Sequence, residues 1–98
     1  MLYIRLCFDK PGQPELRERT RAEHRAYVLP TLQQGSVPRL VQGGPLCVND
    51  EDDANLASFM ILEADNIEQV KQFHEGDPFT RAGLYDRVYI HRWDKHVG

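Results

Sequence analysis

The chain has 98 residues, of which 41% are hydrophobic and 28% are charged, and its net charge is −3 at pH 7. This length suits one domain, and this balance of apolar and charged residues is that of a globular protein rather than a disordered chain. A net negative charge without a basic run argues against a nucleic-acid partner. No apolar stretch approaches the ~20 residues that cross a bilayer and no signal peptide is recognisable, so we expect a cytoplasmic protein without a membrane partner.

Cysteine and histidine do not occur at metal-binding spacings. Cys7 and Cys47 lie far apart, and without a secretory signal we expect reduced, partly buried thiols rather than a disulfide or a nucleophile. His91 and His96 lie near the C-terminus with no histidine–carboxylate cluster beside them. We therefore expect no structural metal, while a catalytic metal held by scattered ligands is left open by spacing alone.

The first half of the chain predicts a strand, a helix and a shorter strand. Residues 2–8 alternate between two sets of side chains, which is the period of a strand that packs on one face. A turn at residues 9–12 leads into residues 15–34, where side chains recur at helical spacing and Pro30 should kink or end the regular part. Residues 39–42 predict the second strand. The apolar set of the first strand is Leu2, Ile4, Leu6 and Phe8, and the centre of the inward helical stripe is Leu16, Thr20, Tyr27 and Thr31.

The second half predicts two more strands and two short helices. The acidic run at residues 49–53 lacks the glycine and the distal glutamate of a calcium loop, and predicts a solvated hairpin tip. Residues 56–63 predict a strand with two largely apolar faces, so we expect helices to cover one face and a second subunit the other. A capped helix at residues 66–76, a single turn at 77–82 and a strand at 85–93 follow. The order β-α-β-β-α-β predicts an α+β, ferredoxin-like fold, an antiparallel sheet with two helices on one face.

His24 is the first candidate for chemistry. On a helix it lies about 40° from the centre of the inward stripe, with Arg17 and Arg21 further round the same side. Such a ring can exchange protons near neutral pH, arginines attract anions, and a carboxylate such as Asp77 would fix the tautomer of the ring. The alternative is a half-buried histidine bonded to a backbone carbonyl, with Asp77 acting only as a helix cap. The residues by themselves leave both interpretations open.

Several short motifs occur together in one order. They are Asp9-Lys10-Pro11-Gly12, Arg17, Arg21-x-x-His24, Gly44-Pro45, Gly76-Asp77-Pro78-Phe79-x-x-Ala82-Gly83-Leu84 and Ile90-x-x-Trp93. In this order and spacing the chain resembles the YciI-like (YCII-related) family over nearly its whole length, as one domain spanning residues 1–98. The chain departs from many members in carrying Pro30 and in having Phe79 in place of a tyrosine.

The resemblance implies both an assembly and a site. Members are ferredoxin-like protomers that pair, sheet facing sheet, into a dimeric α+β barrel. The implied pocket has His24 and Asp77 as the catalytic pair, with Arg17, Arg21 and Phe79 as substrate-binding neighbours.

The resemblance also implies a class of reaction. One relative removes chloride from a chlorinated hydroxyhydroquinone, and the wider barrel superfamily includes muconolactone isomerases. The expected function is that of a cofactor-independent, dehydrochlorinase-like lyase or isomerase for a small oxygenated aromatic-derived compound, anionic or phenolic. The alternatives are a non-catalytic module for small-ligand binding or dimerisation, and a haem-handling barrel protein with a histidine as axial ligand.

Overall fold

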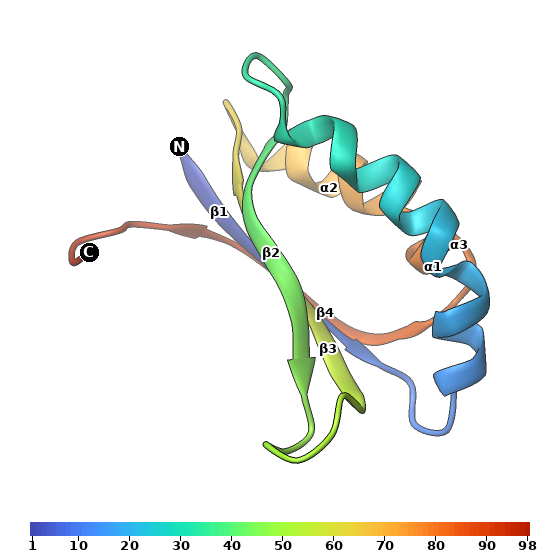
Figure 1. Ribbon diagram of the computed structural model, residues 1–98. Coiled ribbons are helices and arrows are strands. Elements are labelled where there is room, and N and C mark those ends of the chain that lie inside the picture. Colours follow the sequence, from blue (N-terminus) through green and yellow to red (C-terminus); the bar gives the residue numbers. More distant parts are fainter.

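The protein is a four-stranded antiparallel sheet with its helices gathered on one face, as the computed structural model of all 98 residues shows (Figure 1). The elements are β1 (Leu2–Asp9), α1 (Pro14–Val28), the 3-10 turn η1 (Leu29–Leu32), β2 (Arg39–Cys47), β3 (Asn55–Glu63), α2 (Ile67–Gly76), α3 (Pro78–Arg81) and β4 (Tyr85–Trp93). The strands are ordered β2-β3-β1-β4, so β3 and β1 are central. The predicted ferredoxin-like arrangement is confirmed. None of the helices is long and apolar enough to span a membrane.

The first helix is shorter than predicted. It begins with Pro14 at its first position and ends at Val28, whereas helical spacing in the sequence extends to residue 34. Pro30 lies in η1, where its missing amide hydrogen and its ring are tolerated because the α-helical hydrogen bonds have already stopped. The expected effect of Pro30 is thus confirmed, and the regular helix ends two residues before it.

The two helices of the second half start and stop where their caps predict. The Asn66 side chain accepts the Gln69 amide at 3.1 Å and opens α2. The Asp77 side chain accepts the Phe79 amide at 2.9 Å and opens α3 with Pro78 at its first position. Asp77 therefore occupies the junction between two helices.

The second strand is longer than predicted. It continues through Gly43, Gly44 and Pro45, which pair with β3, and its register shifts between Leu40 and Gln42. Glycine and proline weaken a central strand but are tolerated at an edge, and β2 is an edge strand. The acidic hairpin tip at residues 49–53 is exposed, as predicted.

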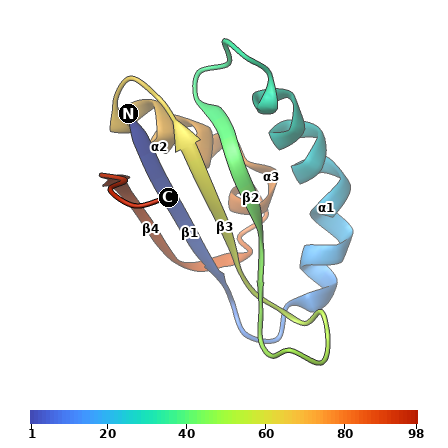
Figure 2. The same cartoon turned by 60° about the vertical axis from the view of Figure 1, so that its left-hand side comes forward.

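The alternation predicted for β1 is present, and the structure shows which of its two faces packs against the helices. Tyr3, Arg5 and Cys7 are the buried residues on that side. The apolar set, Leu2, Ile4, Leu6 and Phe8, is only half-buried and lies on the face that carries no helix (Figures 1 and 2). Alternation identifies two faces but does not say which one meets the helices, and here a paired arginine occupies the inner one.

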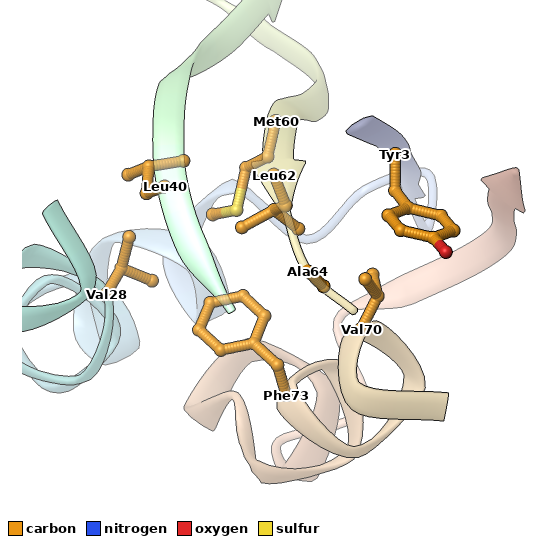
Figure 3. Packing of buried hydrophobic residues seen from close by; sticks show 8 residues of the cluster. All are labelled: Tyr3, Val28, Leu40, Met60, Leu62, Ala64, Val70 and Phe73. Atoms are coloured by element: carbon orange, nitrogen blue, oxygen red, sulfur yellow. The ribbon is translucent and has the colours of Figure 1, made fainter. Parts of the chain in front are cut away.

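The main core lies between the helices and the inner face of the sheet. Figure 3 shows side chains of β3 directed toward Val70 and Phe73 of α2, with Val28 of α1 at the side. The cluster comprises Tyr3, Val28, Leu40, Met60, Leu62, Ala64, Val70 and Phe73. A smaller cluster of Cys7, Phe79, Leu84 and Tyr85 lies around α3. This second cluster supports the site described next.

Candidate active site

His24 and Asp77 are in direct contact. The Nδ1 atom of His24 lies 2.7 Å from Oδ1 of Asp77, although the two residues are 53 positions apart in the chain. The Asp77 side chain is fully buried, and that of His24 is 13% exposed. The same Oδ1 atom accepts the Phe79 amide, so one carboxylate oxygen both caps α3 and binds the imidazole.

The other carboxylate oxygen binds a residue that the sequence did not single out. Arg5 Nη2 donates to Asp77 Oδ2 at 2.8 Å, and both side chains are almost wholly buried. Arg5 Nε donates to His74 Nδ1 at 3.0 Å. In the alternating pattern Arg5 looks like an outward-facing polar residue. The available signal was its place between Tyr3 and Cys7, since cysteine is among the residue types most often buried.

Asp77 is ionised in this network. Burial alone would raise the pKa of its carboxyl, but the hydrogen bond with His24, the charge of Arg5 and the amide of Phe79 outweigh burial and hold that pKa below its usual value. An ionised carboxylate only accepts hydrogen bonds, so the Nδ1 atom of His24 carries the hydrogen. The Nε2 atom of the neutral ring is left with its lone pair, which is the form that takes up a proton.

His74 is held neutral on the other side of Arg5. Its Nδ1 atom accepts a hydrogen from a guanidinium that is always protonated, so this nitrogen carries no hydrogen itself. Burial, and then the positive charge of Arg5, lower the pKa of His74 to about 4. His74 therefore orients Arg5 without adding a second charge.

A cavity of about 370 Å³ lies between α1 and the strands β2 and β3, with His24 in its wall. Pockets for small molecules measure about 300–1,000 Å³, so this cavity suits a compact ligand. Asp77 does not border the cavity; it lies behind His24. The residues that border it include Arg17, Arg21, His24, Leu40, Gly43, Gly44, Pro45, Ser58, Phe59, Met60 and Phe79.

The two arginines predicted for the pocket differ in their surroundings. Arg17 is buried, and its Nε and Nη2 atoms hold both oxygens of Asp9 at 2.7 and 2.8 Å. The Arg21 side chain is 60% exposed at the rim, 3.7 Å from Glu18. Arg17 is thus a fixed part of the wall, and Arg21 is a largely exposed charge that also borders the cavity.

Phe79 joins these groups. Its ring stacks on the His24 ring with centroids 4.0 Å apart and an interplanar angle of 16°. The guanidinium carbon of Arg17 lies 4.8 Å from the centroid of the same ring. The structure therefore brings His24, Asp77, Arg17 and Phe79 together, with Arg21 at the edge.

The structure also shows where the two cysteines and the potential metal ligands lie. No group of three or more His, Cys, Asp and Glu side chains is close enough together to hold a metal ion. Cys7 is buried, and burial raises the pKa of its thiol to about 11. Cys47 is exposed rather than partly buried, and it borders the cavity.

The model of the YCII-related domain matches residues 1–94. The chain belongs to the YCII-related family. Relatives include Protein YciI of Escherichia coli and of Shigella flexneri, each 29% identical over 99 residues, covering 97% of this chain and 98% of theirs. An uncharacterized protein of Haemophilus influenzae has the same identity and coverage. The family assignment made from the motifs is confirmed.

Two solved structures share the fold of this YCII-related protein. One is the 5-chloro-2-hydroxyhydroquinone dehydrochlorinase TftG of Burkholderia phenoliruptrix, in complex with 2,5-dihydroxybenzoquinone; it is 33% identical, with a TM-score of 0.85 and coverage of 98% of this chain and 96% of that one. The other is PA3566 of Pseudomonas aeruginosa, which is 20% identical and has a TM-score of 0.55. The match covers 98% of this chain and 93% of the PA3566 chain, and it shows the fold alone.

Proposed function

We propose that this protein is a cofactor-independent lyase or isomerase that acts on a small, oxygenated, aromatic-derived compound. The observation that carries the proposal is the His24 ring, held by ionised Asp77 through Nδ1 and placed in the wall of a ligand-sized cavity. Similarity to a dehydrochlorinase that binds a small quinone supports the substrate class.

The chemistry requires proton transfer and, in an elimination, the departure of a leaving group. In an elimination from the keto tautomer of the substrate, in which the carbon that carries chlorine is tetrahedral, Nε2 of His24 takes a proton from a hydroxyl or carbon, and the electron pair left behind forms a new π bond. The bond to a leaving group such as chloride then breaks, and chloride departs with the bonding pair. The substrate loses the elements of HCl, so no oxidant or reductant is consumed. In an isomerisation the imidazolium instead returns the proton to another carbon.

The surrounding residues suit this reaction. Asp77 fixes the reactive tautomer of His24 and stabilises the imidazolium that forms. Arg17 and Arg21 are two of the cations that border the cavity and can hold an anionic end of the ligand. Phe79 keeps the imidazole plane in place by stacking.

We also propose that the protein works as a homodimer. The helix-free face of the sheet carries half-buried Leu6 with Phe59 directly opposite on β3, and Ile4 with Ile61 one row along. A contiguous apolar surface of this kind is typical of an interface. A second copy, presenting the same face, is the occupant that the family's barrel geometry favours.

The enzymatic proposal is tested by chloride release from 5-chloro-2-hydroxyhydroquinone under anaerobic conditions. We expect His24→Ala to lower kcat about 100-fold or more, since positioned acid/base groups contribute about 10²–10⁴. Asp77→Asn should also lower kcat at least about tenfold, because the amide can no longer select the Nδ1–H tautomer. His96→Ala, at an exposed position near the C-terminus, is the matched control and should leave kcat unchanged.

The same assay separates the alternatives. Turnover by His24→Ala within a few-fold of wild type would contradict the acid/base role. Binding of 2,5-dihydroxybenzoquinone without turnover of any chlorinated or lactone substrate would identify a ligand-binding module instead. Circular dichroism of Asp77→Asn checks that the loss is not unfolding, since this variant weakens the pairing of buried Arg5.

A further inference from the structure

We propose that Arg25 forms a subsite at the rim of the cavity that binds a carboxylate substituent of the ligand. This inference rests on the proposed function and deepens it by naming the substrate class. The preferred substrate is then a hydroxylated aromatic acid, rather than a phenol or quinone without an acidic substituent. The carboxylate lies at Arg25, at a distinct place from the proton that His24 removes.

Arg25 belongs to a row of arginines on the cavity side of α1. Arg17, Arg21 and Arg25 follow one another at every fourth position, and all three border the cavity. Residues four apart are neighbours on one face of a helix, and eight positions span about 12 Å. The cavity therefore has three cations along α1, across from the strands β2 and β3 (Figure 2).

The three arginines differ in how their charge is compensated. Arg17 is bonded to both oxygens of Asp9, and Arg21 lies 3.7 Å from Glu18. Arg25 forms no ion pair, since those of the other arginines and of lysine all involve different residues. Like charges four positions apart on a helix repel each other, so an anion beside Arg25 would relieve this repulsion. A carboxylate on the ligand is such an anion.

The carboxylates of the cavity wall do not replace this anion. Glu18 and Asp53 are the two that border the cavity. Glu18 lies seven positions before Arg25, about 10 Å along the helix axis, and its closer cation is Arg21. Asp53 lies in the exposed segment between β2 and β3. The guanidinium of Arg25 is thus left available to the ligand.

The surroundings of Arg25 suit a carboxylate on an aromatic ring. The next turn of α1 carries Val28 and Leu29, which also border the cavity. A guanidinium is weakly hydrated for a cation, and its planar fork binds a carboxylate through two parallel hydrogen bonds. The ring of a ligand can therefore contact the apolar part of the wall while its carboxylate meets Arg25. His24 borders the same cavity, so one bound molecule can reach both groups.

The other role open to Arg25 is structural. It lies in the last turn of α1, where a cation interacts favourably with the helix dipole. That role affects the stability of the helix and does not depend on which ligand is bound. The two roles therefore differ in ligand discrimination, which a matched pair of ligands measures.

The probes are 2,5-dihydroxybenzoate and its neutral analogue 2,5-dihydroxybenzamide, with binding measured by isothermal titration calorimetry at neutral pH. We expect wild type to bind the carboxylate at least about tenfold more tightly, because charge-assisted hydrogen bonds are roughly twice as strong as neutral ones. Arg25→Gln should reduce this preference at least about fivefold, the range for a partly exposed charge pair.

Arg19→Gln is the matched control. It removes the same charge from α1, at an exposed position that does not border the cavity, and should leave the preference unchanged. Thermal unfolding of both variants, measured alongside binding, shows whether either substitution perturbs the helix. Loss of the preference in Arg25→Gln, with wild-type affinity for the amide, supports the subsite. Equal affinity of wild type for the two probes, no binding of either, an unchanged preference in Arg25→Gln, or the same loss in Arg19→Gln would overturn it.

The outcomes also distinguish this inference from the proposed function. If Arg25→Gln loses the preference but wild type turns over no chlorinated or lactone substrate, the subsite stands and the enzymatic proposal fails. If wild type releases chloride from 5-chloro-2-hydroxyhydroquinone and binds the two probes equally, the enzymatic proposal stands and the subsite fails.

Discussion

Arg5 is a charged residue that ranks among the most deeply buried side chains of the protein, at 1% exposed. Its guanidinium is bonded to Asp77 on one side and to His74 on the other. Removing one partner of a buried ion pair is strongly destabilising, because an uncompensated charge is left behind. Arg5 thus restricts Asp77 to one orientation, and Asp77 in turn restricts His24.

Sequence reasoning found part of this network and missed the rest for a physical reason. His24 and Asp77 belong to motifs with local meaning, a helix face and a helix cap. Arg5 and His74 acquire their roles only from partners on other elements. Local spacing carries no information about such long-range contacts, so a sequence pattern could not assign them.

His74 should make the stability of the protein sensitive to acid. The pKa of its ring is about 4 in the folded state and 6.5 without the fold. Between these values the unfolded chain binds a proton that the folded chain excludes, so the free energy of unfolding falls as pH drops from 6.5 toward 4. We expect a loss of about 1–3 kcal/mol over this interval. The lowered pKa of Asp77 adds a further loss at lower pH, below its usual 3.8.

His74→Gln isolates this effect. The amide oxygen can still accept from Arg5 Nε but does not titrate, so the decline between pH 6.5 and 4 should be much smaller than in wild type. Urea denaturation at a series of pH values measures it, with the exposed His96→Gln as control. An unchanged pH dependence in His74→Gln would show that another group causes the acid sensitivity.

At the scale of the elements, the ends of a helix can be predicted where a nearby side chain caps or interrupts it. The caps at Asn66 and Asp77 and the interruption at Pro30 were all predictable. The length of β2 was not, because its residues Gly43–Pro45 have low strand preference and pair only since β3 lies beside them. Tertiary pairing overrode local preference there.

Gly76 marks a close contact between the end of α2 and α1. A Cβ atom built on Gly76 would lie 2.5 Å from the hydroxyl of Tyr27, which itself donates to the carbonyl of Phe73 at 2.9 Å. Gly76 has no positive φ, so the reason for glycine here is space rather than backbone conformation. The approach of the two helices depends on the missing side chain.

Gly76→Ala should therefore lower the free energy of unfolding by about 1–3 kcal/mol, the usual cost of overpacking. Combining it with Tyr27→Phe removes the clashing oxygen, so the double variant should be more stable than the sum of the two single effects predicts. Gly44→Ala is the control, since nothing lies within 4 Å of a Cβ there. Strict additivity in the double-mutant cycle would disprove the contact.

At the scale of the whole molecule, the sheet has helices on one side only. On the uncovered side, Leu6 of β1 is flanked by Phe59 of β3 and Tyr89 of the edge strand β4, and Leu2 pairs with Trp93 at one end. The sequence pattern predicts the apolar repeat of β1, but it does not predict which face of the sheet these side chains occupy. The inner face of β1 carries Arg5, whose partners His74 and Asp77 lie far away in the sequence, so the local pattern does not show that this face meets the helices.

The proposed homodimer is tested by placing a charge on this face. Ile61→Glu should shift the protein from dimer to monomer in size-exclusion chromatography with light scattering, because a carboxylate there would be buried without a partner. The single tryptophan, Trp93, should then show red-shifted fluorescence. Leu32→Glu, at a half-exposed leucine of η1, is the control. A wild-type protein that is monomeric at all concentrations would contradict the proposal.

The pairing of Arg5 with His74 and Asp77 also limits how this sequence can change over evolutionary time. Arg5 lies 69 positions from His74 and 72 from Asp77. Replacing Arg5 alone leaves Asp77 without its cation, and replacing His74 alone leaves the Arg5 Nε hydrogen without its acceptor. Descendants of this chain that keep Asp77 are therefore expected to keep Arg5 and an acceptor at position 74, so that the three distant residues are inherited as one unit.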